Sequence, residues 1–413
     1  MKEQIRDNLG NPKELERVYR SNKAMFKREF NLLYPEIQDH TTAQIWHERL
    51  NYEKDQITWG TSRELIFIIV AVLLAGFLVK IPHFTNVDWD FYYSRNLSFF
   101  VLPFLMAYFA WKQHMDIKKL LPVIAAISVS IVVINSLPGP PSDTLDLSTI
   151  HLPLFLWVVL GYTFVAGDTK NLQKRLDFLK FNGELVLMTT IILLAGLLLV
   201  LISWGLFSLI DVEIEDFILD YVVIWGLPAS PIVAAFLVQS NPRLLNKVSP
   251  VIAKMFTPVV LVTLIAFLVA FVVTMQNPFS DRDVLVVFNL LLVCVMAIVL
   301  FSVAEKSKHP YGKIGTYLLL ALTLATVIVN IIALSAIVYR LSEWGITPNR
   351  LAVLGSNLLM LANLLWLNYK LFKTIYNSNE FDRMGDSIAV FLPIYGLWAG
   401  IVTFLFPFIF SFQ

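Results

Sequence analysis

Long stretches without a charged residue constrain this chain more than any other feature of its sequence. The segment from Leu185 to Ile210 holds no charged side chain, and neither does the segment from Met255 to Pro278. A helix of roughly 20 apolar residues crosses the ~30 Å hydrocarbon core of a bilayer with its backbone hydrogen bonds satisfied internally. Only 15% of the residues are charged, against roughly 25% in soluble domains. The sequence therefore predicts an all-α, polytopic membrane helix bundle with the lipid bilayer as its main partner.

About eleven apolar segments are long enough, or nearly so, to span a membrane. We expect them at 64–81, 96–111, 120–137, 151–167, 185–209, 217–239, 251–275, 284–304, 314–339, 350–369 and 388–410. The second and fourth are short and need a thinned bilayer or a tilt into it. This divides the chain into a cytoplasmic segment, 1–63, and a transmembrane helical domain, 64–413.

Lysine and arginine are unevenly distributed over the loops. With the N-terminus inside, the inner segments hold 27 of the 32 Lys and Arg residues. Because cytoplasmic loops carry an excess of these residues, we expect the N-terminus in the cytoplasm and the C-terminus outside. The outer loops are acidic, which reflects either the exclusion of basic residues or the attraction of cations.

The segment 1–63 is polar, with apolar residues at helical spacing. A helix from Pro12 to Tyr34 presents one apolar stripe. The stripe consists of Leu15, Val18, Tyr19, Phe26, Phe30 and Leu33. We expect a surface-lying amphipathic hairpin or a docking site for a protein partner, and the alternative is a segment that packs on the chain's own inner loops.

Common enzyme signatures are missing from the sequence. It contains no Gly-rich phosphate loop, no Gly-x-Ser-x-Gly elbow and no His-Glu-x-x-His helix. The single cysteine, Cys294, excludes an intramolecular disulfide. We expect no cofactor, no resident metal and no nucleic-acid partner, and whether the chain is an enzyme stays open.

The sixth span has the most unusual sequence. Pro228 and Pro231 lie at its centre, with Ser230 between them, and each proline removes a backbone donor. Broken helices of this kind often line transport sites, but a simple kink closed by Ser230 is the alternative. Asp220 lies just over two turns earlier and either faces a polar cavity or reaches the outer interface. We expect Arg95, Arg340 or Arg350 as its partner.

Asparagine side chains recur within the predicted spans. Asn289 and Asn330 belong to this group, with Asn135, Asn357 and Asn363. They either line a polar pathway beside the sixth span or form hydrogen bonds between helices.

The loop after the ninth span contains a distinctive motif, Arg340-Leu-Ser-Glu343-Trp-Gly345-Ile-Thr347-Pro-Asn-Arg350. Glycine at 345 ends one helix, and Thr347 can begin the next. The motif resembles the hallmark of a bacterial inner-membrane family known as domain of unknown function 4153, with Trp344 where tyrosine is more usual. The resemblance implies a bacterial inner membrane as the location and a functional loop, but no activity. The alternative is a tight turn in which Glu343 pairs with an arginine.

The sequence alone is compatible with three functions. The first is a carrier for a small molecule or ion, which a polar cavity at mid-membrane favours. The second is a scaffold acting through residues 1–63, which a dry membrane core favours. The third is an enzyme for a lipid-linked substrate, with Asp216, Asp220, Arg340 and Arg350 converging in a lateral groove. The carrier is our first expectation.

Overall fold

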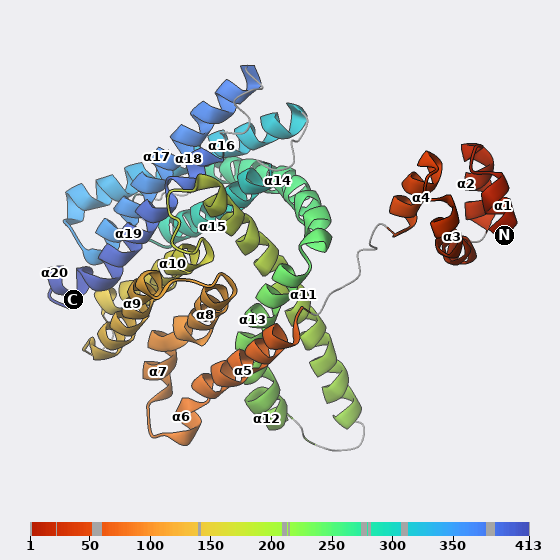
Figure 1. Ribbon diagram of the computed structural model, residues 1–413. Coiled ribbons are helices and arrows are strands. Elements are labelled where there is room, and N and C mark those ends of the chain that lie inside the picture. The colour runs from red at the N-terminus through yellow and green to blue at the C-terminus, as the bar shows by residue number, and fades with distance from the viewer. Residues whose placement is uncertain are drawn as a thin grey trace. The chain divides into compact units, whose positions relative to one another are not determined.

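A computed structural model of the chain is entirely helical in its described secondary structure (Figure 1). It describes residues 2–21, 23–51, 60–138, 142–208, 213, 215–273, 279, 282–306, 313–376 and 385–412. The chain forms two compact units, Met1–Thr58 and Trp59–Gln413.

The first unit is a small helical domain with its own apolar core. It contains α1 (Lys2–Asp7), α2 (Pro12–Ser21), α3 (Lys23–Ile37) and α4 (Thr41–Asn51). The stretch predicted as one helix, from Pro12 to Tyr34, is helical in α2 and α3, but α3 continues beyond the predicted end, with Pro35 inside it. The predicted stripe forms the core, with Leu15, Phe26 and Trp46 buried inside it. Its apolar face is therefore used within the unit and not left for a membrane surface.

The second unit begins with a series of shorter helices, followed in the chain by one long helix. These are α5 (Ser62–Val79), α6 (Ile81–Phe84), α7 (Trp89–Asn96), a 3-10 turn (Leu97–Phe100), α8 (Leu102–Lys112), α9 (Ile117–Ser136), α10 (Asp143–Phe164) and α11 (Leu172–Ser208). Then come α12 (Glu215–Phe217), a π-helical segment (Ile218–Val223), α13 (Ile224–Ser240) and α14 (Pro242–Val273). The last part contains α15 (Arg282–Lys306), α16 (Lys313–Trp344), α17 (Pro348–Tyr376), α18 (Asp386–Ala389), α19 (Leu392–Phe404) and α20 (Phe406–Ile409).

Nine helices within the described residues are long and apolar enough to cross a membrane. They correspond to all the predicted spans except the second and the seventh. The second is α8, whose 11 residues follow a 3-10 turn and are too few for a complete crossing. The seventh lies in α14, where the described apolar stretch is Thr257–Val273. The protein is thus a multi-pass membrane protein, while the count of eleven spans is not confirmed.

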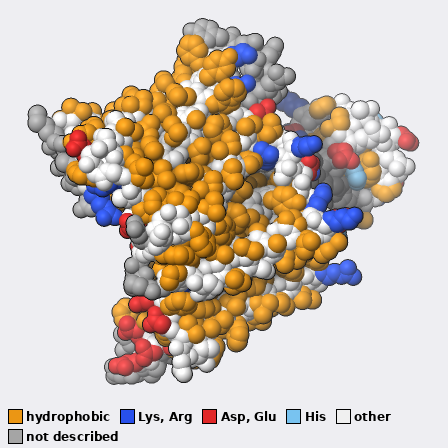
Figure 2. Space-filling model, turned by 90° about the vertical axis from the view of Figure 1, so that its left-hand side faces the viewer, with side chains coloured by type: hydrophobic (Ala, Val, Ile, Leu, Met, Phe, Trp, Pro, Cys, Tyr) orange, Lys and Arg blue, Asp and Glu red, His pale blue; other side chains and the backbone are white. Residues whose placement is uncertain are grey.

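Helix ends that the sequence places on one side of the membrane are in contact. Leu147 near the start of α10, Ala352 near the start of α17 and Phe406 in α20 share one small core. At the opposite helix ends, the hydroxyls of Thr257 on α14 and Ser302 on α15 lie 3.1 Å apart. Figure 2 shows one side of the molecule, where hydrophobic side chains cover the middle of the surface with few charged ones among them. Such a surface suits lipid and not water.

Candidate functional site

Asp220 lies in an irregular part of its helix. The segment Ile218–Val223 is π-helical, and the Ile224 amide donates to the Leu219 carbonyl five residues back. Single π-helical turns are rare and are frequently found at functional sites. The helix then continues through Pro228 and Pro231 to Ser240 without unwinding. The irregularity therefore precedes the prolines, and the predicted break at the prolines themselves is wrong.

The partners of Asp220 come from the first helices of the membrane unit. Its Oδ1 atom lies 3.6 Å from Lys80 Nζ and 3.4 Å from His83 Nε2. Lys80 is buried, whereas the Asp220 side chain is 46% exposed. The His83 contact does not have hydrogen-bond geometry, since neither ring nitrogen of His83 has a hydrogen-bond partner. The expected pairing of Asp220 with an arginine is wrong.

Tyrosines of α7 hold the end of α5 next to this ion pair. Tyr92 and Tyr93 donate from their hydroxyls to the carbonyls of Leu78 and Val79, at 2.7 and 2.9 Å. Burial, and then the negative charge of Asp220, raise the pKa of the Tyr93 phenol. These bonds satisfy carbonyls that the end of a helix leaves without partners. The cluster therefore fixes α5 and α7 to the π-helical segment.

Arg95, proposed above as a partner of Asp220, has a different role. It is buried, and its Nη1 atom donates to the carbonyls of Ile134 and Leu137 at 2.7 and 2.8 Å. These are carbonyls at the end of α9, so Arg95 closes that helix terminus.

Ser230 is buried and satisfied inside α13. Its hydroxyl donates to the carbonyl of Gly226 at 2.6 Å, one turn back. Such back-bonding is the ordinary way for a serine to be accommodated in a membrane helix. Neither Ser230, Pro228 nor Asp220 lines the hollows described below.

Asn289 and Asn330 are brought together through Asn357. The Asn357 amide nitrogen donates to Asn289 Oδ1 at 2.8 Å, and the Asn330 amide nitrogen donates to the Asn357 carbonyl at 3.3 Å. These bonds join α15, α16 and α17 at a buried junction. The arrangement matches the alternative of hydrogen bonding between helices, which supplies specificity of packing in a membrane.

The predicted outer-loop motif forms a capped turn between α16 and α17. Gly345 has a φ of +76°, the left-handed conformation expected of it, and its amide donates to the Leu341 carbonyl at 3.0 Å. The Thr347 hydroxyl accepts from the Arg350 amide at 3.4 Å. Glu343 makes no ion pair with Arg340 or Arg350, all three of which are described residues, so that predicted pairing is wrong.

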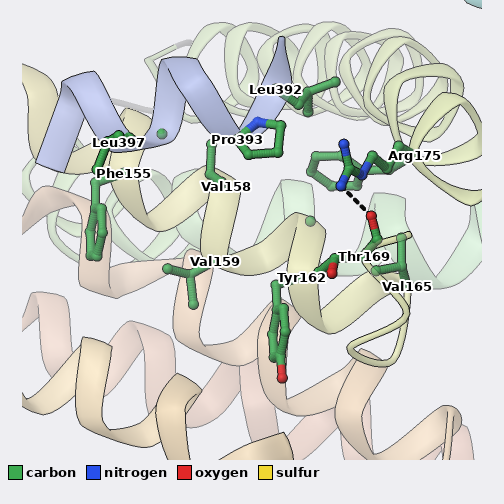
Figure 3. Close-up of a pocket in the computed structure, with 13 residues that line it drawn as sticks. Phe155, Val158, Val159, Tyr162, Val165, Thr169, Arg175, Leu392, Pro393 and Leu397 are labelled. Atoms are coloured by element: carbon green, nitrogen blue, oxygen red, sulfur yellow. Dashed lines mark hydrogen bonds between the residues drawn. The ribbon is translucent and has the colours of Figure 1, made fainter. Parts of the chain in front are cut away.

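Three neighbouring hollows run along α10, and we call them together the α10 groove. The α11 hollow, of about 670 Å³, lies between α10, α11 and α15. The α17 hollow, of about 210 Å³, lies between α10, α15, α17 and α19. The α19 hollow, of about 370 Å³, lies between α10 and α19 (Figure 3). Adjacent hollows share lining residues: Leu154, Trp157, Ala297 and Leu300 for the first two, and Val158 and Leu392 for the last two.

The groove is lined mainly by apolar and aromatic side chains. Polar groups in its wall are mostly bonded to the protein: Trp157 Nε1 donates to Asn182 Oδ1 at 2.9 Å, and Tyr395 accepts from Asn363 at 3.0 Å. Arg175 brings a positive charge to the α19 hollow (Figure 3), where it donates to the carbonyls of Ala389 and Thr169. A wall of this kind suits hydrocarbon and offers a hydrated ion few free groups.

A buried charge cluster beside the groove escaped sequence reasoning. Lys180 on α11 lies 3.6 Å from Glu184 and 3.7 Å from Glu305 on α15. The predicted spans leave 168–184 between membrane segments, yet α11 starts at Leu172. The spacing of Lys180 and Glu184, four residues apart, was the available helical signal. No pattern in the sequence indicates the groove, because its walls come from segments that are distant in sequence.

Comparisons of the chain with protein-family models, with curated proteins and with solved structures found no match. Within the described residues, no group of three or more His, Cys, Asp or Glu side chains is placed to hold a metal ion. The conclusions about function therefore rest on the site itself.

Proposed function

We propose that this protein is a membrane carrier for an amphipathic, lipid-like small molecule. The observation that supports this is the α10 groove, whose α11 hollow of about 670 Å³ falls within the roughly 300–1,000 Å³ of small-molecule sites. The apolar part of the ligand lies along Trp157 and Ala297. Its polar end lies near Arg175 in the α19 hollow.

The nature of the site favours an amphiphile over an ion. An ion crossing the membrane needs polar groups that replace its water shell. Asp220 instead lies at one end of its helix, in an ion pair with Lys80, and Asn289 and Asn330 belong to bonds between helices. The groove offers contact with apolar side chains, which an acyl chain or a similar group requires.

Filling the groove tests this proposal. Ala297 lines both the α11 and α17 hollows and is exposed, so Ala297→Trp fills the groove without disturbing the core. Leu290→Trp is the matched control, because Leu290 lies two turns earlier on α15, is 63% exposed and does not line the groove. We expect the purified Ala297→Trp protein to lose binding of a fluorescent long-chain fatty acid, and the control to keep it. Equal binding by both variants would contradict the proposal.

We also propose that the chain lies in a bacterial inner membrane with its N-terminus in the cytoplasm and its C-terminus outside. The distribution of Lys and Arg over the loops supports this orientation. A reporter that works only outside the cytoplasm should be active when fused after Gln413. Activity of a cytoplasm-only reporter at that position would contradict the eleven-span topology. Membership of the family called domain of unknown function 4153 stays a prediction from the turn at Arg340–Arg350.

Docking of a partner protein on the N-terminal unit is the second candidate. Met25 and Leu32 lie seven residues apart on one side of α3 and are 43% and 63% exposed. Exposed apolar side chains at this spacing suit contact with a helix of another protein. The enzyme hypothesis has less support, because Asp220 pairs with Lys80 while Arg340 and Arg350 contact Trp344.

A further inference from the structure

The turn between α16 and α17 places two arginines on one tryptophan. The guanidinium carbon of Arg340 lies 4.9 Å from the Trp344 ring centroid, and that of Arg350 lies 5.7 Å from it. Both distances are within the range of a cation–π contact. The ring therefore holds two positive charges beside one surface turn.

The two arginines differ in what they bond. Arg350 Nη1 donates to the carbonyls of Trp344 and Gly345, each at 2.7 Å, and so closes the end of α16. Arg340 makes no hydrogen bond and no ion pair with any described residue, and its Nη1 atom is buried without an acceptor. Glu343, the nearest carboxylate in sequence, does not neutralise either charge.

An arginine with unused donors requires an acceptor that the protein does not supply. A guanidinium carries five N–H groups in a fixed planar fork, and this fork matches the oxygens of a phosphate. Arg340 is partly exposed as a residue, so an incoming group can reach its side chain from the surface. The second charge, on Arg350, adds to the attraction for an anion.

The surroundings of the turn are typical of a membrane interface. Trp344 is 50% exposed and Tyr339 is 44% exposed, both near the end of the apolar helix α16, and Ile346, in the turn that follows, is 68% exposed. Tryptophan and tyrosine are enriched where the hydrocarbon meets the headgroups. A phosphate at this depth belongs to a lipid. We propose that Arg340, with Trp344 and Arg350, binds the phosphate of a phospholipid headgroup. This inference is independent of the α10 groove.

The test measures lipid retention by the purified full-length protein. Native mass spectrometry and thermal unfolding are recorded in detergent with dioleoylphosphatidylglycerol, with dioleoylglycerol, which lacks the phosphate, or with inorganic phosphate. We expect Arg340→Gln to weaken phosphatidylglycerol binding about ten-fold, the effect of losing one charge-assisted contact. Arg282→Gln, which removes another exposed arginine at the start of α15, should bind like the parent.

Each comparison has an outcome that overturns the proposal. Equal phosphatidylglycerol binding by Arg340→Gln and Arg282→Gln removes the role of Arg340. Equal stabilisation by dioleoylglycerol shows that the phosphate is not recognised, and equal stabilisation by inorganic phosphate shows a site for a soluble anion. If Arg340→Gln without lipid has the same unfolding temperature as the parent, the variant is folded. Arg340→Lys keeps the charge without the planar guanidinium. Its affinity for phosphatidylglycerol should lie between those of the parent and of Arg340→Gln.

Discussion

Trp157 on α10 and Asn182 on α11 are joined by a hydrogen bond of 2.9 Å across one wall of the α11 hollow. Replacing Trp157 by Phe removes the donor and keeps a smaller aromatic ring at this position. We expect a loss of about 1 kcal/mol in the free energy of unfolding, the ordinary value of one hydrogen bond. The measurement is thermal or denaturant unfolding in detergent. Trp204→Phe, at a 52% exposed position on α11, should leave the stability unchanged.

The ion pair between Lys80 and Asp220 gives a second prediction. Because Asp220 is 46% exposed, its charge is partly screened, and Asp220→Asn should cost no more than about 1 kcal/mol. Lys80 is buried, so the single variant leaves its charge beside the Tyr221 ring, 4.6 Å away, and without the carboxylate. The double variant with Lys80→Met should lose less stability than the two single variants added together. Strict additivity in unfolding experiments would show that the two groups do not interact.

Gly345 gives a third prediction with a close control. A Cβ atom at Gly345 and one at Gly196 both meet open space, but only Gly345 has a positive φ, of +76°. Gly345→Ala should therefore destabilise the protein by about 1 kcal/mol, since L-residues other than glycine are strained there. Gly196→Ala, inside α11, should be neutral or stabilising by up to about 1 kcal/mol. A Gly345→Ala protein that unfolds at the parent temperature would refute the strained turn.

The sequence predicts a feature of this molecule when the residues that determine the feature are close together in the chain. The spans follow from apolar runs, because the bilayer imposes a minimum length on each run separately. Gly345 and Thr347 were predicted correctly, since a turn is determined by its own residues. The start of α11 was misplaced by 13 residues, because the charges of Lys180 and Glu184 indicate a loop until their buried partner on α15 is known.

The other features that the sequence did not predict depend on partners that are distant in sequence. Asp220 pairs with Lys80, which lies 140 positions earlier, and spacing along one helix carries no information about that contact. The α10 groove is likewise a gap between α10, α11, α15, α17 and α19, which only the packing of these helices creates. The N-terminal stripe was identified correctly, but its burial depends on α1 and α4 closing over it.

The N-terminal unit should lose stability in acid through Glu36. The hydrogen bond from Lys2, and then the charges of Lys2 and Arg6, hold the pKa of Glu36 below its ordinary value. The folded state thus releases this proton more readily, so the contribution to stability is present above the unfolded pKa of about 4.3 and is lost as the pH falls through the folded value. The protection factors of α1 and α3 in the full chain, corrected for the pH dependence of intrinsic exchange, should therefore fall over this range.

Glu36→Gln should remove this part of the pH dependence by weakening the contact between α1 and α3 at neutral pH. Glu3→Gln is the control, because Glu3 is exposed on α1 and makes no ion pair with a described residue. An unchanged pH profile of exchange in Glu36→Gln would show that this ion pair does not stabilise the unit.

Photochemical cross-linking by a lipid tests the central claim most directly. A long-chain fatty acid with a diazirine in its chain is irradiated with the purified protein, and the labelled peptides are identified by mass spectrometry. The carrier hypothesis predicts labels concentrated at Pro153–Val158 and Ala297–Ser302, the walls of the groove, and their loss in Ala297→Trp but not in Leu290→Trp. Labels spread evenly over lipid-facing positions such as Leu290 and Val262, with no difference between the two variants, would contradict it.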